Sequence, residues 1–293
     1  MTIKRKLTGR KSKIALPAGL TDCQIHIYDT RFSAHPNGPA IPEGCPNISD
    51  YRHVADWLGI DRSVVTVANA HQADNRSLLA IMADFGKNFR GIASLHNGLN
   101  AGEIDSLQHA GIVGARIMDL PGGAIPFSSL YEIDNITAPR GMMIAVQFNG
   151  NGFLEKWSTL KGVKSRYVID HHGKFFNAIK PDGKEVDQLK LLIDQGNCWF
   201  KFAGCYESST SGPPDYEDVG QIARVIAKYA PDRIIWGTNW PHNASTSTED
   251  YPDDMELLEV ALSWVDSKHH QKVLVSNPEE LFGFPKWNGH KIN

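Results

Sequence analysis

The stretch "SVVTVANAHQADNRSLLAIMADFGKNFRGIASLH" (residues 63–96) contains the pattern that decides the fold. A β-branched and apolar run at 63–69 is followed by a segment of 3.6-residue periodicity at 75–86, and a second apolar run follows at 91–96. This order predicts a strand, a helix and another strand. Because both runs are almost continuously apolar, we expect the two strands to be parallel and covered on both faces.

The same unit recurs along the chain of 293 residues. Runs with strand character lie at 23–28, 63–69, 91–96, 114–119, 143–148, 167–172, 199–204 and 233–238. Helical periodicity lies between several of them, at 47–59, 75–86, 101–111, 186–196 and 216–230. Eight repeats favour a closed barrel over an open sheet, so we predict an α/β protein with one TIM-like (β/α)8 barrel domain over residues 20–293.

The first residues differ from the rest in charge. Residues 1–13 hold six cations and no acid, which leaves a formal charge of −9 for the remainder of a chain whose net charge is −3. We expect residues 1–19 to form a basic N-terminal arm, a solvated tail that packs late or against a neighbouring subunit. Nucleic-acid binding is the less favoured reading of such a charge run, and an oligomer is possible.

No segment resembles a membrane span or an export signal. The run "IALPAGL" (14–20) is too short for a signal peptide, and no stretch approaches the ~20 apolar residues that cross a bilayer. We therefore predict a cytoplasmic protein without a membrane partner. The four cysteines are widely spread and form no C-x-x-C, so we expect reduced packing residues.

Polar residues gather where the predicted strands end. In (β/α)8 barrels the active site is built at the carboxyl ends of the strands. A single polar residue there is as often structural as functional, but eight strands that converge on polar ends favour a site. The candidates by position are Gln24, His26, Asn69, His71, His96, Arg116, Gln147, His171, Lys201 and Asn239.

Four ordered motifs resemble a known family. They are "DCQIHIYD" (22–29), "VIDHHG" (168–173), "WGTNWPH" (236–242) and "VLVSNPEELFGF" (273–284). Together they resemble the amidohydrolase superfamily, in the branch that contains 2-pyrone-4,6-dicarboxylate lactonase. The resemblance spans about residues 20–285 and implies a barrel enzyme that acts on a carboxylated lactone.

Two positions depart from the metal-dependent members of that superfamily. Those members have His-x-His on the first strand and an aspartate on the eighth, whereas this chain has Gln24 before His26 and has Asn239. Neutral amide oxygens are poor ligands for a transition metal. We therefore expect no catalytic metal and no cofactor.

The resemblance also implies roles for the candidate residues. His26, His171 and Asn239 would be catalytic, with His26, His171 and Gln24 donating hydrogen bonds to a polarised carbonyl. Arg116 would bind a substrate carboxylate through its planar fork, unless it forms an ion pair within the barrel. Further substrate contacts would come from Gln24, Asn69, His71, Gln147, Tyr206 and Ser208. His26 as a core histidine, and Tyr206 and Ser208 as loop-folding residues, remain alternatives.

The amide at position 239 suggests a reaction. Asn239 cannot accept a proton from water, which disfavours hydrolysis, whereas an internal transfer between two hydroxyls consumes no net base. Together with the substrate that the resemblance implies, this predicts isomerisation of a sugar-diacid lactone, D-galactaro-1,5-lactone to D-galactaro-1,4-lactone, by intramolecular acyl transfer without metal. A metal-independent lactonase, an inactive sugar-acid binding protein and, as a distant third enzyme reading because its ligands are missing, a metal-dependent decarboxylase are the alternatives. On this reasoning Asn239→Asp would introduce hydrolysis.

Overall fold

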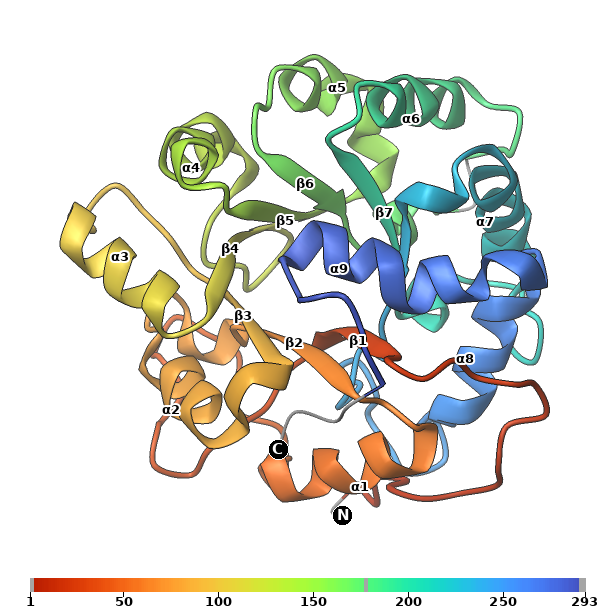
Figure 1. Ribbon diagram of the computed structural model, residues 1–293, viewed down its shortest axis with the longest axis horizontal. Coiled ribbons are helices and arrows are strands. Elements are labelled where there is room, and N and C mark those ends of the chain that lie inside the picture. The colour runs from red at the N-terminus through yellow and green to blue at the C-terminus, as the bar shows by residue number, and fades with distance from the viewer. Residues whose placement is uncertain (1–2, 177–178, 290–293) are drawn as a thin grey trace.

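The computed structural model describes residues 3–176 and 179–289, and it has eight parallel strands in one sheet in the order β1 to β8, with helices outside (Figure 1). The strands are β1 Thr21–Ile25, β2 Arg62–Thr66, β3 Phe89–Ala93, β4 Ile112–Asp119, β5 Met143–Phe148, β6 Arg166–Ile169, β7 Cys198–Phe202 and β8 Ile234–Trp236. The predicted TIM-like barrel is confirmed. No helix in the described ranges is long and apolar enough to cross a membrane.

Helices follow the strands around the barrel. They are α1 Ile48–Leu58, α2 Arg76–Phe85, α3 Ala101–His109, α4 Leu130–Thr137, α5 Phe153–Lys161, α6 Lys184–Asp194, α7 Glu217–Tyr229, α8 Asp254–Ser263 and α9 Asn277–Phe282. Local signals define their ends. In α1, for example, Asn47 and Asp50 form a capping box, and Gly59 ends the helix at φ 72°, in the left-handed region that favours glycine. The five predicted helical segments all contain helices.

Except for β4 and β5, which end at Asp119 and Phe148 as expected, the strands end earlier than the sequence predicts. The run at 63–69 leaves the sheet after Thr66, and the run at 167–172 leaves it after Ile169. Apolar character continues past the last ladder hydrogen bond, because the loops above the barrel are themselves buried. His26 and His171 therefore stand just beyond their strands, on loops that rise from the barrel rim.

The barrel closes between β1 and the segment after β8. Ile25 forms an isolated parallel bridge with Trp240. The His26 backbone N–H donates to the Trp240 carbonyl (2.8 Å), and that of Asn239 donates to the Gln24 carbonyl (2.9 Å). These bonds place Gln24 and Asn239 on neighbouring backbones. They are the two motif residues that differ from the metal-dependent members of the superfamily.

A buried carboxylate strengthens the closure. Asp22 on β1 accepts hydrogen bonds from the Thr238 backbone N–H (2.9 Å), the Thr238 hydroxyl (2.6 Å) and the Tyr51 hydroxyl (3.0 Å). Burial raises the pKa of Asp22 to about 6, although these hydrogen bonds act against the rise. The first and last strands are thus joined by side chains as well as by the backbone.

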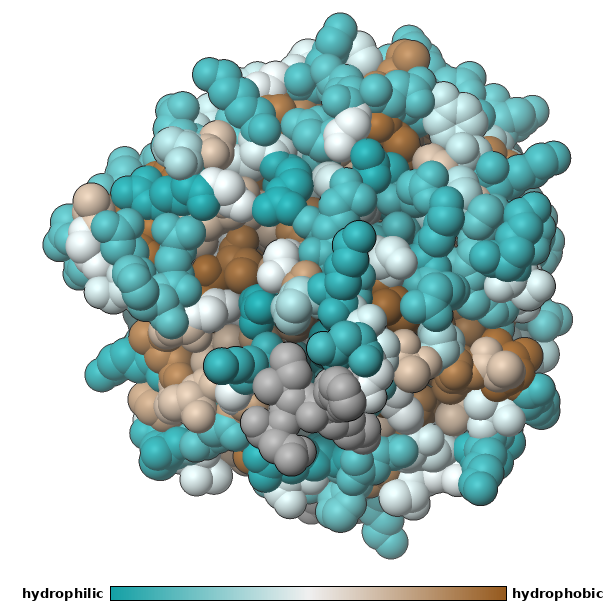
Figure 2. Space-filling view, viewed as in Figure 1, coloured by the Kyte–Doolittle hydropathy of each residue, from teal (hydrophilic) through white to brown (hydrophobic). Residues whose placement is uncertain are grey.

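Helix α9 lies across the end of the barrel where the strands begin (Figure 1). Leu281 and Phe282 pack among interior side chains of the strands, and Arg62 at the start of β2 pairs with Glu279 (3.0 Å). Figure 2 views this end, whose surface is mainly hydrophilic with scattered apolar residues. The end formed by the carboxyl termini of the strands is therefore left for a site.

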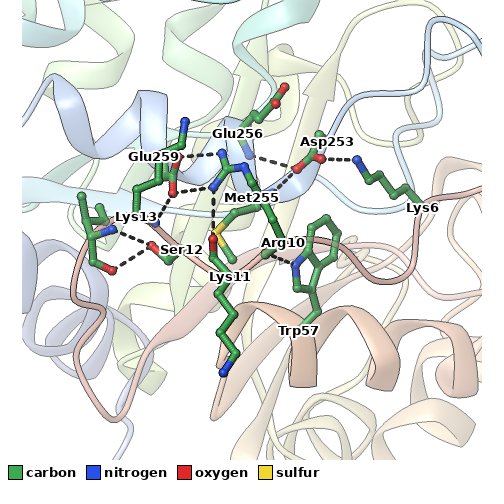
Figure 3. A network of polar contacts seen from close by, with 11 residues as sticks. Lys6, Arg10, Lys11, Ser12, Lys13, Trp57, Asp253, Met255, Glu256 and Glu259 are labelled. Atoms are coloured by element: carbon green, nitrogen blue, oxygen red, sulfur yellow. Dashed lines mark hydrogen bonds and ion pairs between the residues drawn. The ribbon is translucent and has the colours of Figure 1, made fainter.

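The N-terminal arm packs on the barrel, which differs from the expected solvated tail. Arg10 forms two hydrogen bonds with Glu259 of α8 (2.8 and 2.7 Å), and its carbonyl accepts from the Trp57 indole of α1 (2.7 Å), as Figure 3 shows. Leu7 and Ile14 pack against the core. Acidic partners on α8, distant in the sequence, compensate the basic charge.

The cysteines behave as packing residues, as predicted. All four are free, and Cys23, Cys198 and Cys205 are buried. Burial raises the pKa of the thiols, to about 12 for Cys198 and Cys205, so these sulfurs stay protonated at neutral pH.

Candidate active site

A cavity of about 310 Å³ opens at the carboxyl ends of the strands. Of the residues proposed from the sequence, His26, Asn69 and Arg116 line it, and they come from the segments of β1, β2 and β4. Its wall also contains two residues that the sequence reasoning did not select, Tyr28 and His242. The size suits a small ligand, at the place where barrel enzymes hold one.

Arg116 brings a buried positive charge to the cavity. Its Nη1 donates to the Val67 carbonyl (2.9 Å) and to Asn69 Oδ1 (3.0 Å), and its Nη2 donates to Met118 Sδ (3.3 Å) and Gln147 Oε1 (3.4 Å). All these partners are neutral, and within the described ranges its Nε has no hydrogen-bond partner. Burial lowers the pKa of Arg116. A guanidinium without a partner anion favours an anionic ligand over the barrel ion pair.

The surroundings of His26 define its tautomer. Its Nδ1 lies 2.9 Å from the Thr66 carbonyl, which can only accept, so Nδ1 carries the proton. Lys201 donates to Gln24 Oε1 (2.8 Å), which turns the Gln24 amide nitrogen toward His26 Nε2 (3.3 Å). Nε2 is therefore an acceptor. The expected role of His26 as an oxyanion donor does not fit this tautomer, whereas a role as proton acceptor does.

Burial keeps His26 neutral. Burial lowers the pKa of His26 to about 3, and repulsion from Arg116 acts in the same direction. A neutral histidine whose Nε2 accepts from the Gln24 amide thus stands in the cavity wall beside a guanidinium.

Asn239 is fully hydrogen-bonded below the cavity. Its Nδ2 donates to Glu207 Oε1 (2.7 Å) and to the Tyr206 hydroxyl (2.9 Å). Its Oδ1 lies 3.0 Å from His171 Nε2. Because a carboxylate only accepts, the amide nitrogen must face Glu207, and His171 Nε2 must donate to Oδ1. The His171 lone pair is therefore on Nδ1, which has no partner among the described residues.

Glu207 is a site residue that the sequence reasoning missed. It follows Tyr206 after β7 and pairs with Lys174 as well as with Asn239. Burial alone would raise its pKa, but attraction to the His171 ring and to Lys174, together with the hydrogen bonds from Lys174 and Asn239, lowers the pKa to about 2. Acids are common in loops, so nothing local in the sequence marks this one.

His242 was also missed, although it is the last residue of the motif at 236–242. Its Nδ1 lies 2.8 Å from the Tyr206 hydroxyl, and its Nε2 lies 3.0 Å from Oδ1 of the fully buried Asp254. Since Asp254 accepts, His242 donates through Nε2, and its Nδ1 accepts a hydrogen bond from the Tyr206 hydroxyl. This links the cavity wall to Asn239 through Tyr206.

The remaining candidates separate by position. We call Gln24, His171, Tyr206, Glu207 and Asn239 the buried layer, since none of them lines the cavity; Gln24, His171 and Asn239 are buried, and Tyr206 and Glu207 are partly buried. Gln147 is also buried and reaches the site through Arg116. His71 lines a neighbouring cavity, with Nδ1 3.3 Å from the Ser33 carbonyl. Ser208 is buried and does not line the main cavity.

The residues at this end of the barrel do not fit a divalent metal ion. Lys201 is fully buried and pairs with Asp170 (2.6 Å) and Gln24, which places an ammonium where a cation would compete with it. His26 Nε2 and His171 Nε2 both already have amide partners. Across residues 3–176 and 179–289 no three His, Cys, Asp or Glu side chains are grouped to hold a metal ion.

Comparison with known proteins places this geometry in a family. The model of the family described as amidohydrolase matches residues 21–284. The chain is 48% identical over 280 residues to D-galactarolactone isomerase of Agrobacterium fabrum (strain C58 / ATCC 33970), covering 95% of this chain and 96% of that protein. It is 28% identical over 289 residues to the 2-pyrone-4,6-dicarbaxylate hydrolase of Comamonas testosteroni, covering 93% and 92%.

A solved structure agrees. An apo crystal structure of a protein from Agrobacterium tumefaciens superposes with a TM-score of 0.94 at 46% identity, covering 97% of this chain and 100% of that one. The barrel with its site at the carboxyl ends of the strands defines an enzyme fold, and the chain belongs to the amidohydrolase family. Within it the chain is related to a lactone isomerase and to lactone-opening hydrolases, so the resemblance drawn from the motifs is confirmed.

Proposed function

We propose that the protein isomerises a sugar-diacid lactone, D-galactaro-1,5-lactone to D-galactaro-1,4-lactone, by intramolecular acyl transfer without a metal ion. The identity of 48% to D-galactarolactone isomerase supports the reaction. The observation that carries it in the structure is the pairing of Asn239, whose amide donates to Glu207 and Tyr206 and accepts from His171. The place of a hydrolytic base is filled by a group that cannot take a proton.

Glu207 does not replace that base. It does not line the cavity, and its two carboxylate oxygens are already paired, one with Lys174 and one with the Asn239 amide. The internal reaction has no such requirement. A substrate hydroxyl held near the lactone carbonyl can reach an effective molarity of ~10⁵ to 10⁸ M, which favours it over water.

The cavity wall supplies the groups for this step. Arg116 binds the free carboxylate and orients the ring. The 4-hydroxyl oxygen forms a bond to C1, the bond between C1 and the ring oxygen O5 breaks, and one proton passes from the attacking to the leaving oxygen. When the substrate hydroxyl replaces the Gln24 amide at His26 Nε2, that nitrogen accepts the proton and returns it, so no base is consumed.

The other proposed substrate contacts are of two kinds. Asn69 lines the cavity and meets a substrate hydroxyl directly. Gln24, Gln147, His171 and Tyr206 act from below, by orienting the groups in the wall. Direct contacts from His71 and Ser208 need a rearrangement of their loops. The cytoplasmic location, the lack of nucleic-acid and membrane partners, the possible oligomer and the lack of a metal or cofactor stay predictions from the sequence.

A metal-independent lactonase is the second candidate. Relatives at 27% and 28% identity are named as hydrolases, and the His171 Nδ1 lone pair is free of partners in the part of the chain described. In this reading His171 would activate water.

Product analysis by NMR separates the candidates. We expect D-galactaro-1,5-lactone to give the 1,4-lactone faster than in buffer alone, with unchanged turnover after treatment with EDTA. Open-chain acid as the main product would establish the lactonase, and no product would indicate a binding protein. Loss of turnover with EDTA that zinc or manganese restores would overturn the metal-free reaction.

A further inference from the structure

The basic arm is an extended segment with two different sides. Ile3, Arg5 and Leu7 are partly buried, whereas the alternating Lys4 and Lys6 are exposed. Successive side chains of an extended chain point in opposite directions, so Arg5 shares the inward side with two apolar residues. Of the arm's cations in this stretch, it is the one turned toward the barrel.

Arg5 reaches the cavity that contains Arg116. Both guanidinium-bearing residues line it, one from the arm and one from β4. Arg5 Nη1 donates to the Glu43 carbonyl (2.8 Å), and its Nε is buried without a hydrogen-bond partner in the described ranges. Burial raises the pKa of Tyr28 to about 12, and the charges of Arg116 and Arg5 both act against that rise. Tyr28 in the wall is thus within range of both cations.

The arm holds Arg5 in place before any ligand arrives. The Arg10 fork and the Lys13 backbone N–H (2.6 Å) both bind Glu259, and Lys6 pairs with Asp253, as Figure 3 shows. The hydrogen bonds from Arg10 lower the pKa of Glu259 to about 2. A side chain fixed by its neighbours loses less conformational freedom on binding.

Two guanidiniums on one small cavity match a ligand with an acyl group at each end. A sugar diacid has two carboxylates, and its monolactone has one carboxylate and one acyl oxygen, on which negative charge grows when the carbonyl is attacked. A single arginine would suffice for a sugar monoacid. The second cation therefore bears on which class of sugar acid is accepted.

We propose that Arg5, delivered by the N-terminal arm, is a second anion-binding residue of this cavity and selects ligands that carry carboxyl-derived groups at both ends of a short polyhydroxylated chain. The inference deepens the proposed function and rests on it for the identity of the substrate. It assigns the basic arm a role in specificity.

Calorimetry with two open-chain acids tests the assignment. Galactarate has two carboxylates, and galactonate is its matched monoacid. We expect Arg5→Gln to weaken galactarate binding by 10- to 100-fold and galactonate binding by less than threefold, with partial recovery in Arg5→Lys. Lys11→Gln removes a charge from an exposed position of the same arm and should change neither affinity. Arg10→Ala, which releases the arm, should resemble Arg5→Gln.

The outcomes test the role of Arg5 independently of the proposed isomerisation. Equal affinities of Arg5→Gln and the wild type for galactarate, equal losses for both acids, or no binding of either acid by the wild type would overturn it. A wild type that fails to isomerise the lactone but loses diacid preference in Arg5→Gln would refute the proposed function and support the role of Arg5. If the wild type isomerises the lactone and Arg5→Gln leaves its KM unchanged, the proposed function is supported and the role of Arg5 is refuted.

Discussion

The buried layer and the cavity wall differ in whether their charged groups have a partner of opposite charge. In the buried layer, Asn239 uses both N–H donors and its oxygen, and Glu207 meets Asn239 and a lysine. In the wall, Arg116 has only neutral partners and His26 has an accepting Nε2. A charge paired with its counter-ion holds its network in place, whereas a buried guanidinium with neutral partners can receive an anion from a ligand. The chemistry is therefore expected from the wall, and the layer beneath it positions the wall.

The strongest test of this contrast is at His26. His26→Gln should lower kcat by about 10²- to 10⁴-fold, because the proton acceptor is lost, with a smaller change in KM. His53→Gln, on the exposed side of α1, is the control and should behave as wild type. Steady-state kinetics by NMR measures both. If His26→Gln remained active, the proton acceptor would have to be assigned to a residue of the buried layer.

Asn239→Asp probes the buried layer itself. It places a second carboxylate 2.7 Å from Glu207 Oε1 and removes both donors. The structure thus changes the expectation from the sequence: the single variant should lose about 3 to 5 kcal/mol of unfolding free energy and hydrolyse little lactone, because the two carboxyls share a proton. Denaturant unfolding and product analysis measure these effects.

A second substitution sharpens the result. Asn239→Asp combined with Glu207→Gln exchanges the amide and the acid, so one carboxylate again faces a donor. This double variant should be more stable than Asn239→Asp alone and should release open-chain acid. Glu207→Gln by itself is the control. If Asn239→Asp were as stable as wild type, the layer would not depend on its hydrogen-bond pattern.

Arg116 in the wall should matter for binding. Arg116→Ala removes a charge-assisted pair worth about 1.5 to 3 kcal/mol, so kcat/KM should fall by about 10- to 150-fold. Arg116→Lys should recover part of it. The melting temperature should fall only modestly, because Arg116 loses hydrogen bonds to neutral groups and no ion pair. Wild-type kinetics in Arg116→Ala would place the substrate carboxylate elsewhere, and exposed Arg76→Gln is the control.

The smallest expected effect is that of pH on activity. The neutral form of His26 is the active one, and with a pKa of about 3 it is present throughout the neutral range. The profile of kcat/KM should therefore be flat from about pH 8 to 5, without the inflection near 6.5 of an ordinary histidine. An inflection there would assign the proton transfer to another group.

Stability should behave differently over the same range. His26 and His172 have pKa values of about 3 in the folded state, below the ordinary value of 6.5, so unfolding takes up protons below that pH. The free energy of unfolding should then fall as pH drops below 6.5, by up to about 1.4 kcal/mol per unit for each histidine, and below about pH 6 protonation of Asp22, whose folded-state pKa is raised to about 6, offsets part of this fall. Urea titrations at pH 5, 6 and 7 measure this slope.

The sequence by itself determined the barrel and the end that carries the site. The run at 143–148 coincides with β5, and the recurrence of strand and helix implied parallel strands whose carboxyl ends meet. From this alone His26, Asn69 and Arg116 could be assigned to one cavity, which they line. Periodicity records burial along each element, and burial is enough to build the barrel.

Only the tertiary structure decided what each polar group can do. The orientation of the Gln24 amide depends on Lys201, 177 positions away, and that of Asn239 depends on Glu207, 32 positions away. Likewise, an arginine in a basic tail became part of the cavity only because acids on α8 hold the arm. A donor or acceptor acquires its role from the partner that faces it, and in a barrel those partners come from different strands and loops that meet only after the chain has folded.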